Sequence, residues 1–155
     1  METLLWESSP HIIANLILLC FIGIPVAIID TKNQLIPLYL SIPGIAIAIF
    51  VQLFFNVSPL LLAAEILIGF ILFYFIRILT KKGLGLGDAL ISAFIAILLG
   101  LWGWLVTIFI AASGALIFSL VILKMNIHDR TKRIPFAPFL LGGALITMLL
   151  YLLLL

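Results

Sequence analysis

Three acidic side chains stand in or beside long apolar runs of the sequence. Asp30 follows one run, Glu65 lies inside another and Asp88 opens a third. A carboxylate at the centre of a bilayer costs about 2.5–3.5 kcal/mol even on lenient insertion scales, so ionisable groups at such positions are candidates for function. Carboxyl groups give and take protons, and the chemistry to consider is therefore acid–base chemistry within an apolar bundle.

Asp30 and Asp88 each have a purely structural explanation. Asp30 can simply end a helix before a basic loop. Asp88 can cap the start of a helix, since aspartate side chains accept hydrogen bonds from the free N–H groups of a first turn. That explanation leaves the alternate glycines Gly83, Gly85 and Gly87 unaccounted for. Glycine permits close approaches that a Cβ forbids, so this segment could accommodate an extended peptide against its main chain.

The composition predicts the elements that must position these residues. Of 155 residues, 66% are hydrophobic and 9% are charged, whereas soluble domains carry about 25% charged residues. The apolar runs are mostly near the roughly 20 residues that a helix needs to cross a bilayer. We expect an all-α bundle of six transmembrane helices, forming a single domain over residues 1–155. The expected spans are 11–29, 37–55, 59–79, 89 to about 103, 104–123 and 136–155.

Two boundaries carry extra information. The fourth and fifth runs are separated only by Trp102-Gly103-Trp104, which suits a hairpin at the membrane interface because indole rings favour the headgroup level. The segment before the first run holds Glu2 and Glu7 but neither lysine nor arginine, so it lacks the basic region of a signal peptide. We therefore expect the first helix to remain in the mature protein.

The basic residues predict the orientation of the bundle. Seven of the 8 fall in the connections after the first, third and fifth runs, and Arg77 lies in the last residues of the third run. The positive-inside rule makes that side cytoplasmic. Both termini are then outside. Asp30 and Asp88 lie at the cytoplasmic edge, where an antiparallel bundle could bring them together. The basic residues are Lys32, Arg77, Lys81, Lys82, Lys124, Arg130, Lys132 and Arg133.

Three motifs stand in order at helix ends. The first is an aspartate about seven residues before an Ile-Pro pair, the second is Gly-x-Gly-Asp, and the third is Ile-Pro-Phe-x-Pro-Phe. Their residues are Asp30 and Pro37, then Gly85, Gly87 and Asp88, then Pro135, Phe136 and Pro138. Together with six apolar runs, these motifs resemble those of the type IV prepilin peptidases. These are integral-membrane aspartic endopeptidases of bacteria, with archaeal preflagellin peptidases as relatives.

This resemblance implies a function and a site. It marks Asp30 and Asp88 as the catalytic pair and the other motif residues as their supporting surroundings. Family members cut prepilins and pseudopilins at the cytoplasmic face, between a short leader and a hydrophobic helix. The implied partners are such a substrate and the lipid bilayer of a bacterial or archaeal cytoplasmic membrane, with no nucleic acid, no cofactor and no metal. The resemblance leaves the oligomeric state open.

The two aspartates are expected to divide the acid and base roles of a peptide hydrolysis. Like charges a few ångströms apart cannot both ionise cheaply, so the carboxyl groups share one proton. One then activates a water molecule as the base, and the other acts as the acid. Asp88 lies at a predicted helix N-terminus, which favours negative charge, and Asp30 at a predicted C-terminus. We therefore expect Asp88 to be the base.

Some positions depart from the family pattern, which usually has lysine where Leu90 stands, Asp or Asn where Leu38 stands and Gly where Ala137 stands. Many bacterial members also carry an N-terminal domain with paired cysteines that methylates the product, whereas Cys20 is the single cysteine here. We expect peptidase activity without methyltransferase activity. A non-catalytic membrane assembly factor or a small transporter is the alternative interpretation.

Other ionisable residues are assigned no catalytic role. Glu65 stands four residues before Gly69 and shares its helix face, so we interpret it as a protonated side chain bonded to a neighbouring helix. His11 and His128 stand at the edges of predicted loops without further ligands nearby. A zinc site, which needs three or four such ligands, is therefore not expected.

Overall fold

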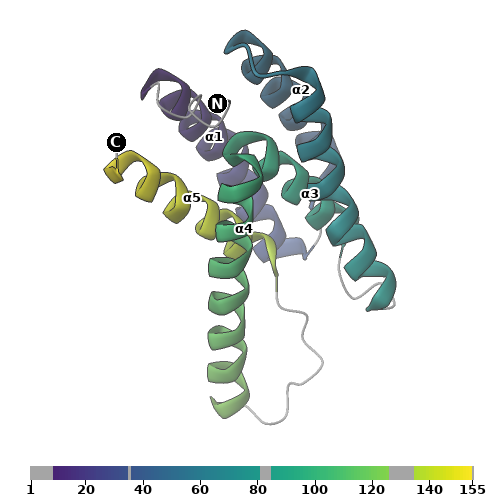
Figure 1. Cartoon of the computed structure of the whole chain (residues 1–155). Helices are drawn as coiled ribbons and strands as arrows, with labels where there is room; N and C mark the ends of the chain where they lie inside the picture. Colours follow the sequence, from purple (N-terminus) through teal and green to yellow (C-terminus); the bar gives the residue numbers. More distant parts are fainter. Residues whose placement is uncertain (1–8, 35, 81–84, 126–134, 155) are drawn as a thin grey trace.

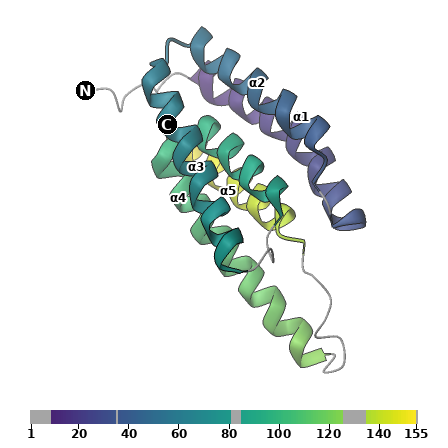
Figure 2. The same ribbon diagram turned by 90° about the vertical axis from the view of Figure 1, so that its right-hand side faces the viewer.

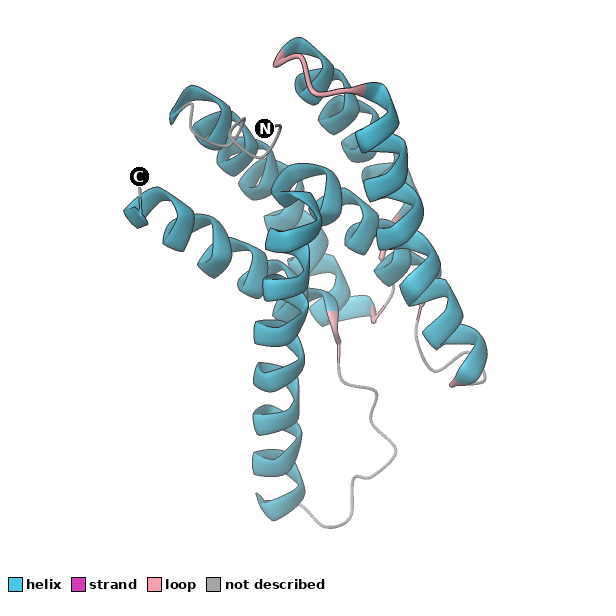
Figure 3. Cartoon of the chain, in the orientation of Figure 1, coloured by secondary structure: helices cyan, strands magenta, loops and turns pink. Residues whose placement is uncertain are grey.

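The computed structural model describes residues 9–34, 36–80, 85–125 and 135–154, and in these ranges the regular structure is entirely helical (Figure 3). The prediction of an all-α fold is confirmed. The helices are α1 (Ser9–Asn33), α2 (Leu38–Phe54), α3 (Pro59–Leu79), α4 (Leu86–Met125) and α5 (Ala137–Leu154). Three described stretches are long and apolar enough to cross a membrane, namely Pro10–Asn33, Pro59–Leu79 and Leu86–Val121, whereas α2 and α5 are shorter apolar helices.

Helix α4 is broken at Gly100, which divides it into the segments 86–99 and 101–125 (Figure 1). Gly100 has φ 66° and ψ 172°, a conformation that glycine adopts at little cost because it has no Cβ. The indole N–H of Trp104 donates to Ser92 Oγ at 2.9 Å, whereas a continuous helix would separate these residues by about 18 Å along its axis. The chain therefore turns back on itself at Gly100.

The sequence predicted the boundary between the fourth and fifth spans at Trp102-Gly103-Trp104. The break at Gly100 places that boundary earlier in the chain. Trp104 is 2% exposed and bonded within the bundle, while Trp102 is 77% exposed. The interfacial position expected for both indole rings is thus wrong for Trp104. The rule that places indoles at the headgroup level does not apply to a ring whose N–H has a buried partner.

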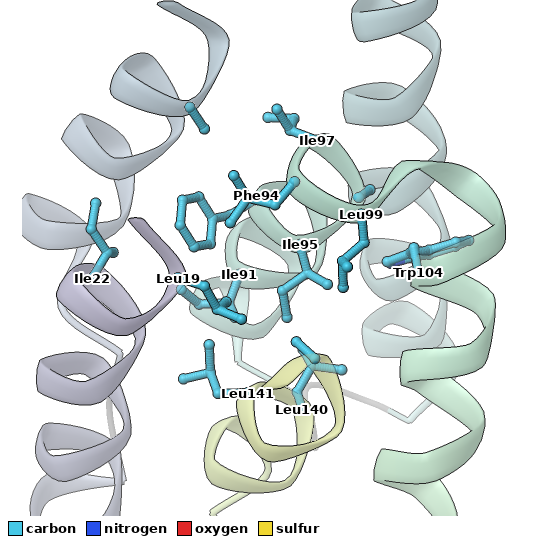
Figure 4. Packing of buried hydrophobic residues seen from close by; sticks show 14 of the residues in the cluster. Leu19, Ile22, Ile91, Phe94, Ile95, Ile97, Leu99, Trp104, Leu140 and Leu141 are labelled. Atoms are coloured by element: carbon cyan, nitrogen blue, oxygen red, sulfur yellow. The ribbon is translucent and has the colours of Figure 1, made fainter. Parts of the chain in front are cut away.

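The segment 86–99 is the centre of the bundle. Every residue from 91 to 100 is buried, and α4 contacts each of the other four helices. Figure 4 shows Ile91, Phe94 and Ile95 among side chains of α1 and α5, including Leu19 and Leu140. A helix that is apolar on all sides is covered either by protein or by lipid, and the other helices cover this one.

Small residues let α3 approach this central segment closely. A Cβ placed on Gly69 would lie 2.9 Å from Ala96 Cβ and 3.0 Å from Ala93 Cα. Ser92 Oγ donates to the carbonyl oxygen of Gly69 at 2.8 Å. Helices in membranes associate through this combination of small residues and interhelical hydrogen bonds, because lipid supplies no hydrophobic driving force between them.

The connection between α2 and α3 is a short turn over residues 55–58, as expected. Asn56 takes φ 60°, which asparagine tolerates better than most residues. Ser58 Oγ accepts the N–H of Leu61 at 3.3 Å, and Pro59 is the first residue of α3. Both features are typical helix starts.

The basic residues that predict the orientation are only partly described. Lys32 lies in the last turn of α1 and Arg77 in the last turn of α3. In Figures 1 and 2 these two helix ends point to the same side of the bundle, which is also where α5 begins. Lys124 lies near the end of α4. Outside the described residues lie the other basic positions, Lys81, Lys82, Arg130, Lys132 and Arg133.

Candidate active site

Asp30 is buried near the end of α1, where it meets the start of α5. Its side chain is 5% exposed, and Oδ2 accepts the backbone N–H of Ala137 at 3.2 Å. Ala137 is the first residue of α5, and the first N–H groups of a helix have no partner within it. A carboxyl group of the first motif thus binds the start of the helix that carries the third motif.

Asp88 lies at the start of α4 and is 8% exposed. It is the third residue of the helix rather than the residue before it, so the capping position is Gly85, three residues before the expected one. Its Oδ2 accepts the N–H of Gly85 at 2.9 Å. This bond from the third helical residue back to the capping position is one half of a capping box, and it holds the Asp88 side chain over the first turn.

Gly87 is required by a close contact with the first motif. A Cβ on Gly87 would overlap Ile36 Cβ and lie 2.8 Å from its Cγ2. Ile36 and Pro37 lead into α2, and Pro37 is the residue before its first turn. The glycine therefore lets the start of α4 pack directly on the segment that follows Asp30, which brings the first and second motifs together.

The charges of Asp30 and Arg77 both act on Asp88, the first repelling and the second attracting its negative form. Asp30 comes from α1, Arg77 from the last turn of α3 and Asp88 from α4. Charges interact more strongly in surroundings of low polarity than in water. Two carboxyl groups from opposite halves of the sequence therefore share one buried region, with a cation at its side.

The third motif closes this region from the side of α5. The Phe136 ring contacts that of Phe73 on α3, with centroids 6.0 Å apart. Ala137 is fully buried, while Pro135 and Pro138 are half-buried. Ala137 stands where the family usually has glycine, and its methyl group is accommodated within the core. All the motif residues named from the sequence thus lie at one end of the bundle.

The other two departures from the family pattern lie in different surroundings. Leu90 is half-buried in the first turns of α4. Leu38, the first residue of α2, is 48% exposed. Neither position places a charged group beside the aspartates.

The expected division of roles between the aspartates loses its physical basis. It rested on Asp30 lying at a helix C-terminus and only Asp88 lying at an N-terminus. Asp30 lies one turn before the end of α1, but its carboxyl oxygen accepts the first N–H of α5. Each aspartate therefore binds one backbone N–H at the positive end of a helix, and the helix dipoles no longer distinguish them.

A second buried polar cluster, at the opposite end of segment 86–99, was not recognised from the sequence. His11 Nε2 donates to Gln52 Oε1 at 2.6 Å, so His11 lies inside the bundle rather than at a loop edge. Gln52 Nε2 donates to the carbonyl oxygen of Ile97 at 2.9 Å, and Asn15 Nδ2 to that of Leu98 at 3.0 Å. The available signal was the presence of neutral polar residues inside apolar runs.

Glu65 is 3% exposed on the face of α3 that packs on α4. It lies one turn from Gly69, away from Arg77 and the aspartates, so the structure does not bring it into the site. Within the described ranges, no three His, Cys, Asp or Glu side chains are grouped so that they could hold a metal ion.

Comparison with known proteins identifies the family of the chain. The model of the type IV leader peptidase family matches residues 16–120, which include Asp30, Asp88 and the central segment 86–99. The chain belongs to this family and is therefore a membrane protein related to peptidases. The matched range ends before the third motif, so the contact of Asp30 with Ala137 is an independent structural observation. No curated protein and no solved structure matches the chain.

Proposed function

We propose that the protein is an aspartic endopeptidase that removes the short leader of type IV prepilins or pseudopilins, with Asp30 and Asp88 as its catalytic pair. The observation that carries this proposal is that Gly87 packs on Ile36, which brings the start of α4 to the segment after Asp30, so that the charges of the two buried carboxyl groups interact. A chain that merely ended two helices with aspartate would gain nothing by placing like charges together, because their repulsion opposes folding. Membership of a leader peptidase family supplies the reaction class.

The proposed mechanism needs one proton shared between the carboxyl groups. The ionised group removes a proton from water as the water oxygen bonds to the peptide carbonyl carbon. The other group gives its proton to the carbonyl oxygen, which forms a tetrahedral diol. The group that took the water proton then gives it to the amide nitrogen, while the other group takes a proton from a diol hydroxyl. The carbon–nitrogen bond breaks, the leader leaves with a new carboxyl group, the product leaves with a new N-terminal amine, and one proton remains on the pair.

We propose that this reaction takes place at the cytoplasmic side of the membrane. Lys32 and Arg77 lie at the same end of the bundle as the aspartates, and cationic residues mark the cytoplasmic side. We further propose that segments 86–99 and 101–125 cross the membrane separately, which together with α1, α2, α3 and α5 makes six crossings and leaves both termini outside. Alkaline phosphatase fused after Leu155 is expected to be active, and a fluorescent protein fused there dark.

The proposed location also explains how water reaches the site. Segment 86–99 is about 21 Å long, which is shorter than the roughly 30 Å of a hydrocarbon core. With its Gly100 end near one surface, its Asp88 end lies below the headgroups on the other. Non-helical backbone at that depth must be covered by protein or line a water-filled cavity. We propose the second here, because hydrolysis requires water.

The test is co-expression with a type IV prepilin and measurement of its size. Asp30→Asn and Asp88→Asn each retain a side-chain oxygen that can accept the Ala137 or Gly85 N–H, yet neither can transfer the proton. We expect each to lower processing at least about 1,000-fold. Glu65→Gln is the matched control, because it removes the third buried carboxyl group while leaving the pair intact, and it should process normally.

Processing that survives in both asparagine variants would contradict the assignment of the pair. Absence of processing by the unmodified protein, with every prepilin tried, would instead favour the alternative of a non-catalytic assembly factor or transporter.

A further inference from the structure

An apolar groove of about 170 Å³ lies between α1 and α5. Its walls include Gly23 and Ala27 from α1 and Pro138, Gly142 and Leu145 from α5. The side chain of Leu141 lies between the two helices in Figure 4. All the residues that line the groove are apolar or glycine, so it offers no hydrogen bond to a polar ligand.

Two glycines shape the groove in different ways. A Cβ on Gly23 would come within 2.9 Å of Leu141 Cδ2, so this glycine lets α1 and α5 touch. An added Cβ on Gly142 would meet nothing within 4 Å. The space beside Gly142 is therefore open because the residue has no side chain, although the helices on either side are in contact.

One end of the groove reaches the candidate active site. Ala27 stands three residues before Asp30, and Pro138 directly follows Ala137, whose N–H is bonded to the Asp30 carboxyl group. The α1 wall extends from Ala27 back to Leu19, which corresponds to about 12 Å along the helix. The groove thus leads from the neighbourhood of Asp30 into the apolar part of the bundle.

We propose that this groove binds the apolar helix of the substrate that follows the cleaved bond, a proposal that rests on the proposed function. A substrate that presents a peptide bond to the pair and continues into the bilayer must leave the site beside its membrane-facing wall. Its backbone must be helical there, because lipid satisfies no N–H or carbonyl group. Side chains four residues apart lie about 6 Å from each other on one face of a helix, so the groove accommodates two or three of them.

The test enlarges Gly142 and measures processing of two prepilins. One carries large apolar residues at the first positions of the helix after the cleaved bond, and the other carries alanine at the same positions. Gly142→Leu is expected to lower processing of the first prepilin at least about tenfold relative to the second, because the new side chain occupies the space of the substrate's own. Gly142→Ala is expected to have a smaller effect in the same direction.

Ala112→Leu is the matched control, since Ala112 is exposed on α4 and does not line the groove. It should leave the ratio between the two prepilins unchanged. An unchanged ratio in Gly142→Leu, with wild-type processing intact, would overturn the groove as the binding site. Loss of processing in the wild type itself would instead contradict the proposed function.

A photo-crosslinking residue at Leu145 provides a second readout that does not depend on turnover. In the Asp88→Asn background we expect adducts with the prepilin helix from position 145 and none from position 112. Adducts only with lipid, or only with a second copy of the chain, would overturn the proposal.

Discussion

The two ends of segment 86–99 both bury polar groups among apolar side chains, but they do so in opposite ways. At the Leu99 end, the neutral amides of Gln52 and Asn15 donate to carbonyl oxygens of the last turn. At the Leu86 end, two carboxyl groups accept backbone N–H groups at helix starts and repel each other. At both ends, these side chains bond to backbone groups of helix termini, which would otherwise lack hydrogen-bond partners.

We propose that the difference between the ends separates stability from function. The amide cluster pairs donors with acceptors and contains no charge in conflict with another. The carboxyl cluster keeps a repulsive pair that simple apolar packing would avoid. Local conflicts of this kind are concentrated at functional sites, where the rest of the fold compensates for them. The predictions below compare the effect of damage at each end.

The largest contrast is expected at Asp30. Both Asp30→Asn and Asp30→Ala should abolish prepilin processing, with a loss of at least about 1,000-fold. Only the alanine variant should also lose stability, by about 1 kcal/mol, because it leaves the first N–H of α5 without its acceptor. Processing assays and thermal unfolding in detergent measure the two effects. Equal stability of the two variants would show that the bond to Ala137 contributes little.

A smaller effect on processing is expected when Gly87 is replaced by alanine. The new Cβ would overlap Ile36 and force the start of α4 away from it, at a cost of about 1–3 kcal/mol. A displacement of about 1 Å is enough to lower turnover roughly 100-fold. Gly114→Ala is the matched control, because its Cβ would lie at an ordinary 3.5 Å from Phe139. Similar processing rates in both glycine variants would disprove the steric argument.

At the opposite end, Gln52→Leu should lower stability without lowering turnover per folded molecule. The variant loses bonds to His11, Asn15 and the Ile97 carbonyl group, with an expected cost of about 1–3 kcal/mol. Phe54→Leu, at a position that is 75% exposed on the same helix, should change stability by less than about 0.5 kcal/mol. A fall in turnover that matched the Asp30 variants would break the proposed separation of the two ends.

The smallest effect is expected for Ser92→Ala, which lies between the two ends. It removes the bonds to the Gly69 carbonyl group and the Trp104 indole, and such interhelical bonds contribute about 1 kcal/mol in membranes. Unfolding measurements should detect this loss while processing stays normal. Ser113→Ala, on the second segment of α4, serves as the comparison and should show no loss.

Hydropathy was sufficient to predict the helices but not their environment. The runs that became α1, α2, α3 and α5 were recognised because apolar length is a direct physical requirement for crossing lipid. Hydropathy did not show that segment 86–99 is central, since lipid-facing and buried residues are equally apolar. It also gave no sign that Trp104 packs inside, or that the chain breaks at Gly100.

The candidate site was also predictable only in part: the sequence identified its residues but not their bonding partners. Asp30 and Asp88 were found from the sequence because carboxyl groups are costly in apolar runs. Their bonding partners were not, since Asp30 meets an N–H that lies 107 residues away in the chain. The helix-dipole argument for their roles was incomplete for the same reason, and the assignment of acid and base stays a prediction. It used the helix that carries Asp30 and could not include α5, which lies against it.

By itself, the sequence determined that the chain is an all-helical membrane protein of the type IV leader peptidase family, and which carboxyl groups to examine. Composition and local motifs are sufficient for that, because each residue pays its own cost of transfer into lipid. Only the tertiary structure decided that Asp30 binds the start of α5, that Gly87 packs on Ile36, and that an apolar groove lies between α1 and α5. These depend on contacts between distant segments, which local sequence does not specify.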